Sequence, residues 1–85
     1  MFSIEYHREA FRALARMPRT TAERIRSKIE TLAVDPDAPN NNVKKLVDRP
    51  GFRLRVGEWR VIYEIQRDRV VILELTVAPR GGAYQ

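Results

Sequence analysis

Hydrophobic residues alternate with polar ones at the start of the chain. In FSIEY, residues 2–6, the side chains of Phe2, Ile4 and Tyr6 fall on one side of an extended segment. This period of two is typical of a strand that is buried on one face. A short first strand is therefore predicted at residues 2–6.

The hydrophobic spacing then becomes helical. One face of REAFRALARMP is apolar, and Pro18 ends the segment. The residues of this face are Ala10, Phe11, Leu14 and Met17. A second helix is predicted from Thr20, with Thr20 or Thr21 as its N-cap residue. Its predicted buried side consists of Ala22, Ile25, Ile29, Leu32 and Ala33. The short link predicts an antiparallel helical hairpin.

A proline- and asparagine-rich loop, DPDAPNNN at residues 35–42, separates the helices from further strands. The first of these strands alternates apolar residues with Arg53 and Arg55, and Gly57-Glu58 is predicted to turn the chain. The next strand ends near QRDR, residues 66–69, which forms another predicted turn. The last strand is VVILELTV, residues 70–77, whose apolar start favours a central position in the sheet.

The predicted order is β-α-α-β-β-β, which is an α+β fold. A helical hairpin packs on one face of a small, mainly antiparallel sheet, to which the first strand is added. The helix-facing residues are predicted to be Phe52, Leu54, Val56, Trp59, Val61 and Tyr63. The opposite face must then look outward.

Three arginines, Arg53, Arg55 and Arg60, share this outward face on adjacent strands. Neighbouring cations repel each other, so the cluster does not stabilise the sheet by itself. One interpretation is a surface for a polyanion such as a nucleic-acid backbone. The other is an ordinary solvated strand face with scattered salt bridges. The same face is predicted to carry Glu64, Glu74 and Thr76.

Composition adds limits to this picture. The 85 residues predict a single domain over residues 1–85, and the net charge is +5, with 13 arginines among 16 cations. This charge fits a nucleic acid, an acidic protein, or simply a soluble basic surface. The chain has no cysteine, no membrane-length apolar run and no signal-peptide pattern at its start. We expect a cytoplasmic protein without membrane association.

No spacing of side chains predicts a metal cluster, a carboxylate pair or a phosphate-binding glycine loop. His7 is interpreted as a surface or helix-start residue, and Trp59 as a packing residue. In the tail, Arg80 and Tyr84 follow the last strand and are placed at the rim of the basic face. The alternative for these two residues is a frayed terminus.

Four segments together resemble the RelE/ParE superfamily of toxins from type II toxin–antitoxin systems. They are REAFRALARMP, KKL, FRLRVGEWRVIYEI and VAPRGGAY, and the resemblance covers essentially the whole chain. It implies a RelE-like fold. For the RelE branch it also implies an endoribonuclease that needs no metal or cofactor and cleaves messenger RNA in the ribosomal A site. The ribose 2′-hydroxyl attacks the adjacent phosphate and the 5′-oxygen leaves.

The resemblance assigns roles by position. Arg60 and Arg80 would hold the scissile phosphate, and Tyr84 would stack against the base or assist proton transfer. Arg53 and Arg55 match basic residues that are lysines in some members, and arginine cannot act as a base. These two would then act electrostatically, which leaves Tyr84 as a proton acceptor. Lys44 and Lys45 would bind RNA backbone.

The same resemblance implies partners and leaves two other functions open. The partners are a RelB-like antitoxin on a separate chain, in a hetero-oligomer, together with the ribosome and mRNA. One alternative is a ParE-like inhibitor of DNA gyrase that does not cut RNA. The other is an inactive module that binds RNA or antitoxin.

Overall fold

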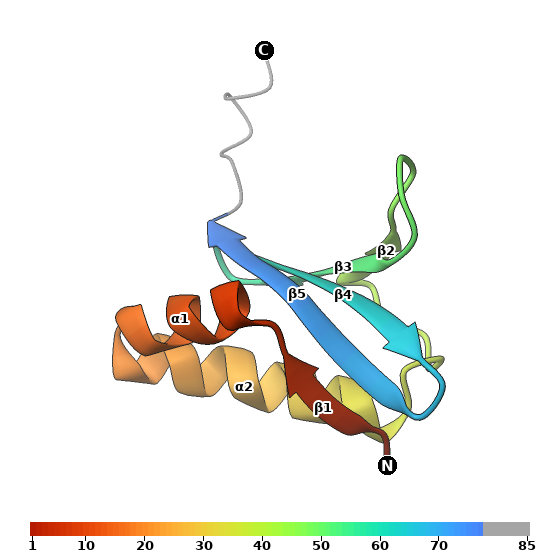
Figure 1. Ribbon diagram of the computed structural model, residues 1–85, viewed down its shortest axis with the longest axis horizontal. Coiled ribbons are helices and arrows are strands. Elements are labelled where there is room, and N and C mark those ends of the chain that lie inside the picture. The colour runs from red at the N-terminus through yellow and green to blue at the C-terminus, as the bar shows by residue number, and fades with distance from the viewer. Residues whose placement is uncertain (78–85) are drawn as a thin grey trace.

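Seven elements follow one another along residues 1–77, the part of the chain that the computed structural model describes (Figure 1). They are β1 (Ser3–Tyr6), α1 (Arg8–Arg16), α2 (Arg19–Val34), β2 (Val43–Lys45), β3 (Phe52–Val56), β4 (Trp59–Gln66) and β5 (Arg69–Val77). Arg80 and Tyr84 of the predicted site lie outside the described residues.

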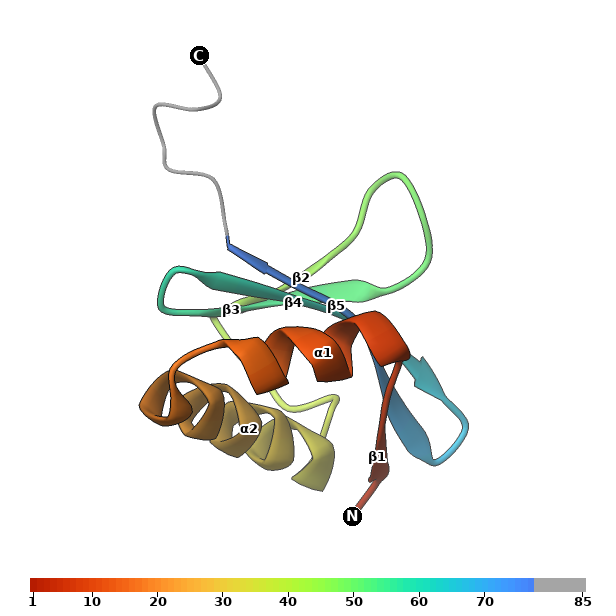
Figure 2. The ribbon, with the colours of Figure 1, turned by 60° about the vertical axis from the view of Figure 1, so that its left-hand side comes forward.

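The five strands form one mixed sheet in the order β1-β5-β4-β3-β2. Strand β1 pairs with β5 in parallel, and the other neighbours are antiparallel. Both helices lie on one side of the sheet and run in opposite directions (Figure 2). The predicted α+β fold, with a helical hairpin on one face of a mainly antiparallel sheet, is therefore confirmed.

The hydrophobic core lies between the helices and this face of the sheet. Ile25 and Ile29 of α2 are fully buried at the four-residue spacing that aligns side chains on one helical face. The sheet contributes a second layer, composed of Leu54, Val56, Val61, Tyr63, Val70, Ile72 and Leu75. Phe52 and Trp59 are partly buried against it. The predicted helix-facing strand residues are thus found in the core or packed on it.

Tyr63 is the largest fully buried side chain, and its ring stacks on that of Phe52 with centroids 5.4 Å apart. Burial raises the pKa of Tyr63 to about 12, because the phenolate loses hydration that the neutral phenol does not need. The neutral phenol is therefore favoured in the folded state. The contribution of this neutral phenol to the free energy of unfolding is fully present below about pH 10, the pKa of tyrosine in the unfolded chain. It is lost as the pH rises from about 10 to about 12.

We expect alkaline pH to destabilise the native chain more than the Tyr63→Phe variant, by roughly 2 kcal/mol between pH 9 and pH 12. The variant shares every other ionisable group with the native chain, so the difference isolates Tyr63. Urea unfolding at a series of pH values measures this difference. Parallel pH dependence of the two proteins would contradict the assignment.

A β-bulge in β5 changes which of its side chains face the helices. Tyr63 pairs with Ile72 while the preceding Ile62 pairs with Glu74, so Leu73 is an extra residue on β5. Val70 and Ile72 face the core, and after the bulge the next core residue is Leu75 rather than residue 74. In a regular strand, residue 74 would point to the same face as Ile72. The bulge therefore moves Glu74 to the outward face.

Three sequence predictions about local structure were wrong or incomplete. Strand β2 was not predicted. Phe11 was assigned to the apolar face of the first helix but is 60% exposed. It lies about 100° around the helix from Ala10, and α1 buries only a narrow face, at Ala10 and Leu14, against β5. Neither threonine caps α2, which begins at Arg19, because the Pro18 carbonyl already accepts a hydrogen bond from the Ala22 amide at 2.9 Å.

Candidate nucleic-acid interface

Four cationic side chains lie together on the sheet face opposite the helices. Strand pairing puts Arg55 of β3 directly opposite Arg60 of β4, and Arg53 of β3 directly opposite Lys44 of β2. Cross-strand neighbours have Cβ atoms about 4.5–5.5 Å apart. We call Lys44, Arg53, Arg55 and Arg60 the basic strand face. The predicted grouping of the three arginines is thus found in the strand register.

The tight turn between β3 and β4 fixes this register. Val56 pairs with Trp59, and only Gly57 and Glu58 lie between them. Gly57 has a φ of +59°, which a glycine adopts without steric cost. Because the turn has two residues, Arg55 and Arg60 must be partners across the strands.

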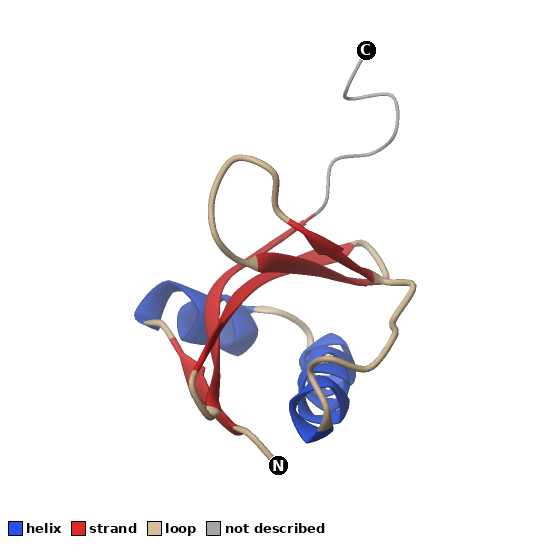
Figure 3. Cartoon of the chain, turned by 90° about the vertical axis from the view of Figure 1, so that its right-hand side faces the viewer, coloured by secondary structure: helices blue, strands red, loops and turns tan. Residues whose placement is uncertain are grey.

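A loop covers part of the basic strand face. The loop between β2 and β3, residues 46–51, arches over the sheet on the side away from the helices (Figures 2 and 3). A pocket of about 350 Å³ lies between this loop and the sheet. Its lining consists of Leu46, Asp48, Arg49, Arg53, Arg60, Ile62 and Glu74. The site is therefore a hollow with cations in its floor rather than a flat strand face.

The guanidinium groups in this floor lack acceptors of their own. The Nε atoms of Arg53 and Arg60 are buried and have no hydrogen-bond partner among residues 1–77. A buried donor without an acceptor is destabilising by roughly 1–3 kcal/mol. The salt bridges formed within the described part of the chain, Arg49–Glu74 and Arg69–Glu5, include none of the basic strand face. An anionic ligand rich in oxygen atoms would satisfy these donors.

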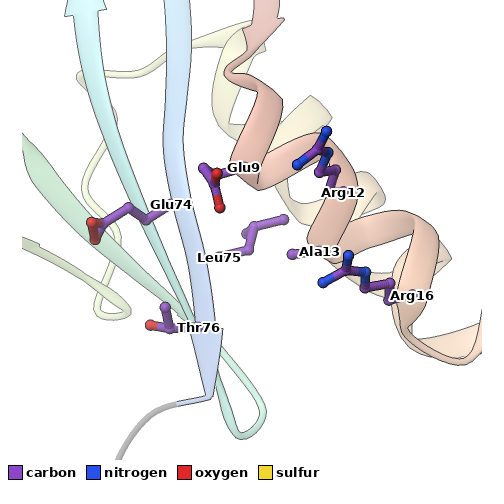
Figure 4. A pocket seen from close by; sticks show the side chains of 7 residues that line it. All are labelled: Glu9, Arg12, Ala13, Arg16, Glu74, Leu75 and Thr76. Carbon is purple, nitrogen blue, oxygen red and sulfur yellow. The ribbon is translucent and has the colours of Figure 1, made fainter.

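Glu74 brings a negative charge to the same pocket. Its carboxylate accepts a hydrogen bond from Arg49 at 3.3 Å, and both side chains are about half exposed. Figure 4 draws a different pocket, between α1 and β5, which Glu74 also lines. In that view Glu74 and Thr76 point away from α1, whereas Leu75 points toward it. The floor of the pocket thus combines two arginines of β3 and β4 with one carboxylate of β5.

The strand register separates the two predicted RNA-binding lysines. Lys44 lies opposite Arg53 and belongs to the basic strand face, whereas Lys45 lies opposite Phe52 and points to the other side of β2. The alternation in VKK could have revealed this strand, but three residues are too few for a periodic signal. The Arg49–Glu74 contact, which joins residues 25 apart, was also not predicted.

The described part of the chain offers no metal site and places its histidine away from the pocket. Within residues 1–77 no group of three or more histidine, cysteine, aspartate or glutamate side chains is arranged to hold a metal ion. His7 is exposed at the start of α1 and does not line the pocket. In that same range, no helix has the length and apolar character needed to cross a membrane.

Residues 4–84 match the model of a protein family described as ParE toxin of type II toxin–antitoxin system, parDE. The chain is therefore a toxin of the RelE/ParE superfamily. Within this superfamily it belongs to the ParE toxin family of type II toxin–antitoxin systems.

Several proteins that are similar to this chain carry the name RelE. A protein of Methanocaldococcus jannaschii named "Putative toxin RelE1" is 28% identical over 86 residues, which cover 99% of this chain and 96% of the relative. The RelE–RelB complex from Pyrococcus horikoshii OT3 matches with a TM-score of 0.80 and 24% identity, over 94% of this chain and 98% of that chain. The isolated E. coli RelE toxin matches with a TM-score of 0.80 and 17% identity, over 99% and 92%. These structures share the fold.

Proposed function

We propose that this toxin is a ribosome-dependent endoribonuclease that cleaves mRNA in the A site and so inhibits translation in the cytoplasm. The observation that carries the proposal is the pocket floored by Arg53 and Arg60, whose buried Nε donors have no acceptor within residues 1–77. A phosphodiester supplies acceptor oxygens and negative charge at once. The similarity to RelE toxins supports the same activity.

In the proposed reaction the ribose 2′-oxygen forms a bond to the adjacent phosphorus and the bond from phosphorus to the 5′-oxygen breaks. The phosphoryl oxygens gain negative charge in the transition state, and fixed guanidinium groups stabilise this charge. Arg60 and Arg80 hold the scissile phosphate in this scheme. Arg53 and Arg55 supply further positive potential without exchanging protons. These roles require no metal or cofactor.

The flanking contacts position the RNA. Tyr84 stacks on the base next to the cleaved bond, as aromatic side chains do with unpaired bases. Lys44 extends the basic strand face and binds a neighbouring phosphate, and Lys45 binds ribosomal RNA from the other side of β2.

A cognate antitoxin on a separate chain is the second proposed partner. Structures similar to this chain include RelE–RelB and RelBE toxin–antitoxin complexes. An acidic segment of a RelB-like antitoxin would neutralise the basic strand face and exclude RNA from it. The inactive state is then a toxin–antitoxin hetero-oligomer.

Inhibition of DNA gyrase is a second candidate function, because the matching family model describes ParE toxins. Such an inhibitor would bind protein and leave RNA uncut. The cationic pocket favours the first function, since binding to a protein surface does not require unpaired buried guanidinium donors.

Induction of the toxin without antitoxin separates these functions when mRNA ends are mapped and gyrase supercoiling is measured in the same cells. We expect cuts in register with translated codons, and we expect Arg80→Ala to abolish them. Intact transcripts together with DNA breaks would instead establish the gyrase function. Intact transcripts with normal supercoiling would leave an antitoxin- or RNA-binding module without activity.

A further inference from the structure

The proposed reaction needs a group that accepts the proton of the 2′-hydroxyl, and the basic strand face does not provide one. Arginine stays protonated at any working pH, so Arg53, Arg55 and Arg60 cannot serve. His7, the single histidine of the chain, is not among the residues that line the pocket. Tyr84, the acceptor that the resemblance implies, lies outside the described residues. Within residues 1–77 the candidates are therefore the other residues that line the pocket.

Two carboxylates line the pocket, Asp48 and Glu74. Asp48 belongs to the exposed loop between β2 and β3. Glu74 belongs to β5 and pairs with Ile62 of β4. A group on a strand is held more rigidly than a group on a loop, which suits a proton acceptor that needs a defined geometry. Glu74 is therefore the better placed of the two.

The β5 bulge is what brings Glu74 to this pocket. Ile62 faces Glu74 across the strands, and Arg60 faces Thr76, so Glu74 is the diagonal neighbour of Arg60. Diagonal neighbours are about 7–8 Å apart at Cα, which leaves space for a phosphate and its ribose between long side chains. Bulges next to functional sites commonly redirect a side chain in this way.

We propose that Glu74 is the general base of this ribonuclease, an inference that rests on the proposed function. The Glu74 carboxylate takes the proton from the ribose 2′-hydroxyl as the 2′-oxygen bonds to phosphorus. The bond to the 5′-oxygen breaks, and that oxygen takes a proton from water. The products are a 2′,3′-cyclic phosphate and a 5′-hydroxyl end, and Glu74 returns its proton to solvent.

The contact with Arg49 is compatible with this role. At 3.3 Å, and with 47% and 45% of the two side chains exposed, the Arg49–Glu74 pair is a surface ion pair that contributes roughly 0–1 kcal/mol. Incoming RNA can displace Arg49 at little cost. The contact with Arg49 therefore leaves the Glu74 carboxylate able to accept a proton.

Single-turnover cleavage of mRNA on purified ribosomes tests the proposal through its dependence on pH. Glu74→Gln keeps the size of the side chain and one acceptor oxygen but removes the base. We expect it to lower the cleavage rate about 10²–10⁴-fold and to abolish the acidic limb of the pH–rate profile. Glu74→Asp, which keeps the carboxylate, is expected to retain that limb at a reduced rate.

Glu64→Gln is the matched control, because Glu64 lies on the same sheet face but outside the pocket and bonds to Gln66 at 2.9 Å. It is expected to cleave within a few-fold of the unchanged toxin. If Glu74→Gln cleaved at the native rate with the native pH profile, the proposal would be overturned. It would also be overturned if the acidic limb were lost in Tyr84→Phe but kept in Glu74→Gln. If Arg49→Ala lowered the cleavage rate as much as Glu74→Gln does, and neither variant changed the pH–rate profile, Glu74 would be a positioning residue and not the base. Absence of cleavage by the unchanged toxin would overturn the proposed function itself.

Discussion

Replacing Arg60 with alanine is expected to abolish growth inhibition and to lower mRNA cleavage on ribosomes about 10²–10³-fold, the usual effect of removing one preorganised donor to a developing charge. Arg60 is half-buried in the floor of the pocket, and its Nε has no partner within residues 1–77. Replacing Arg60 therefore breaks no hydrogen bond from this Nε that holds the fold together. The effect should fall on the transition state rather than on the fold.

Thermal unfolding of Arg60→Ala is expected to separate activity from stability. Arg55 lies directly opposite Arg60, and like charges in this arrangement destabilise a strand pair by roughly 0.2–1 kcal/mol. Removing one of them should leave the melting temperature unchanged or slightly raised. Arg19→Ala, which removes an exposed arginine at the start of α2, is the matched control and should retain full toxicity. Full toxicity of Arg60→Ala would show that the pocket is not the site.

Replacing Ile29 with alanine is expected to destabilise the fold by about 2–5 kcal/mol. Ile29 is fully buried where α2 covers the sheet, and the change leaves a cavity that the two packed layers cannot close. Small domains have a total stability of roughly 5–15 kcal/mol, so the variant should be partly unfolded in mild denaturant.

Urea unfolding of Ile29→Ala and Val34→Ala measures this contribution. Val34 lies on the same helix and is 63% exposed, so its replacement should change stability by about 0.5 kcal/mol or less. Similar unfolding midpoints for the two variants would contradict the assignment of Ile29 to the core. Loss of toxicity in Ile29→Ala is expected to follow loss of folded protein, with no change in the pH dependence of residual cleavage.

The sequence predicts those features that depend on local spacing. The period of two around Arg53 and Arg55, joined to the Gly57-Glu58 turn, is enough to place Arg60 beside them. The four-residue spacing of Ile25 and Ile29 likewise predicts the buried face of α2. In both cases the geometry is set by residues that are close along the chain.

Features that depend on contacts between residues far apart along the chain could not be predicted from local spacing. Strand β2 is formed by pairing with β3 across the loop and has no periodic signal of its own. The bulge at Leu73 depends on the fit between β4 and β5, although Glu74 was correctly predicted to face outward. The roofed pocket exists because the loop between β2 and β3 folds back over the sheet, where Arg49 reaches Glu74.

The most direct measurement is cleavage of an mRNA on purified ribosomes, with either ribose or 2′-deoxyribose at the nucleotide before the scissile bond. A pocket that holds the phosphate while the 2′-oxygen attacks is expected to cut only the ribose-containing message, leaving a 2′,3′-cyclic phosphate and a 5′-hydroxyl. Equal cleavage of both messages, or no cleavage of either by the folded toxin, would contradict the proposed reaction.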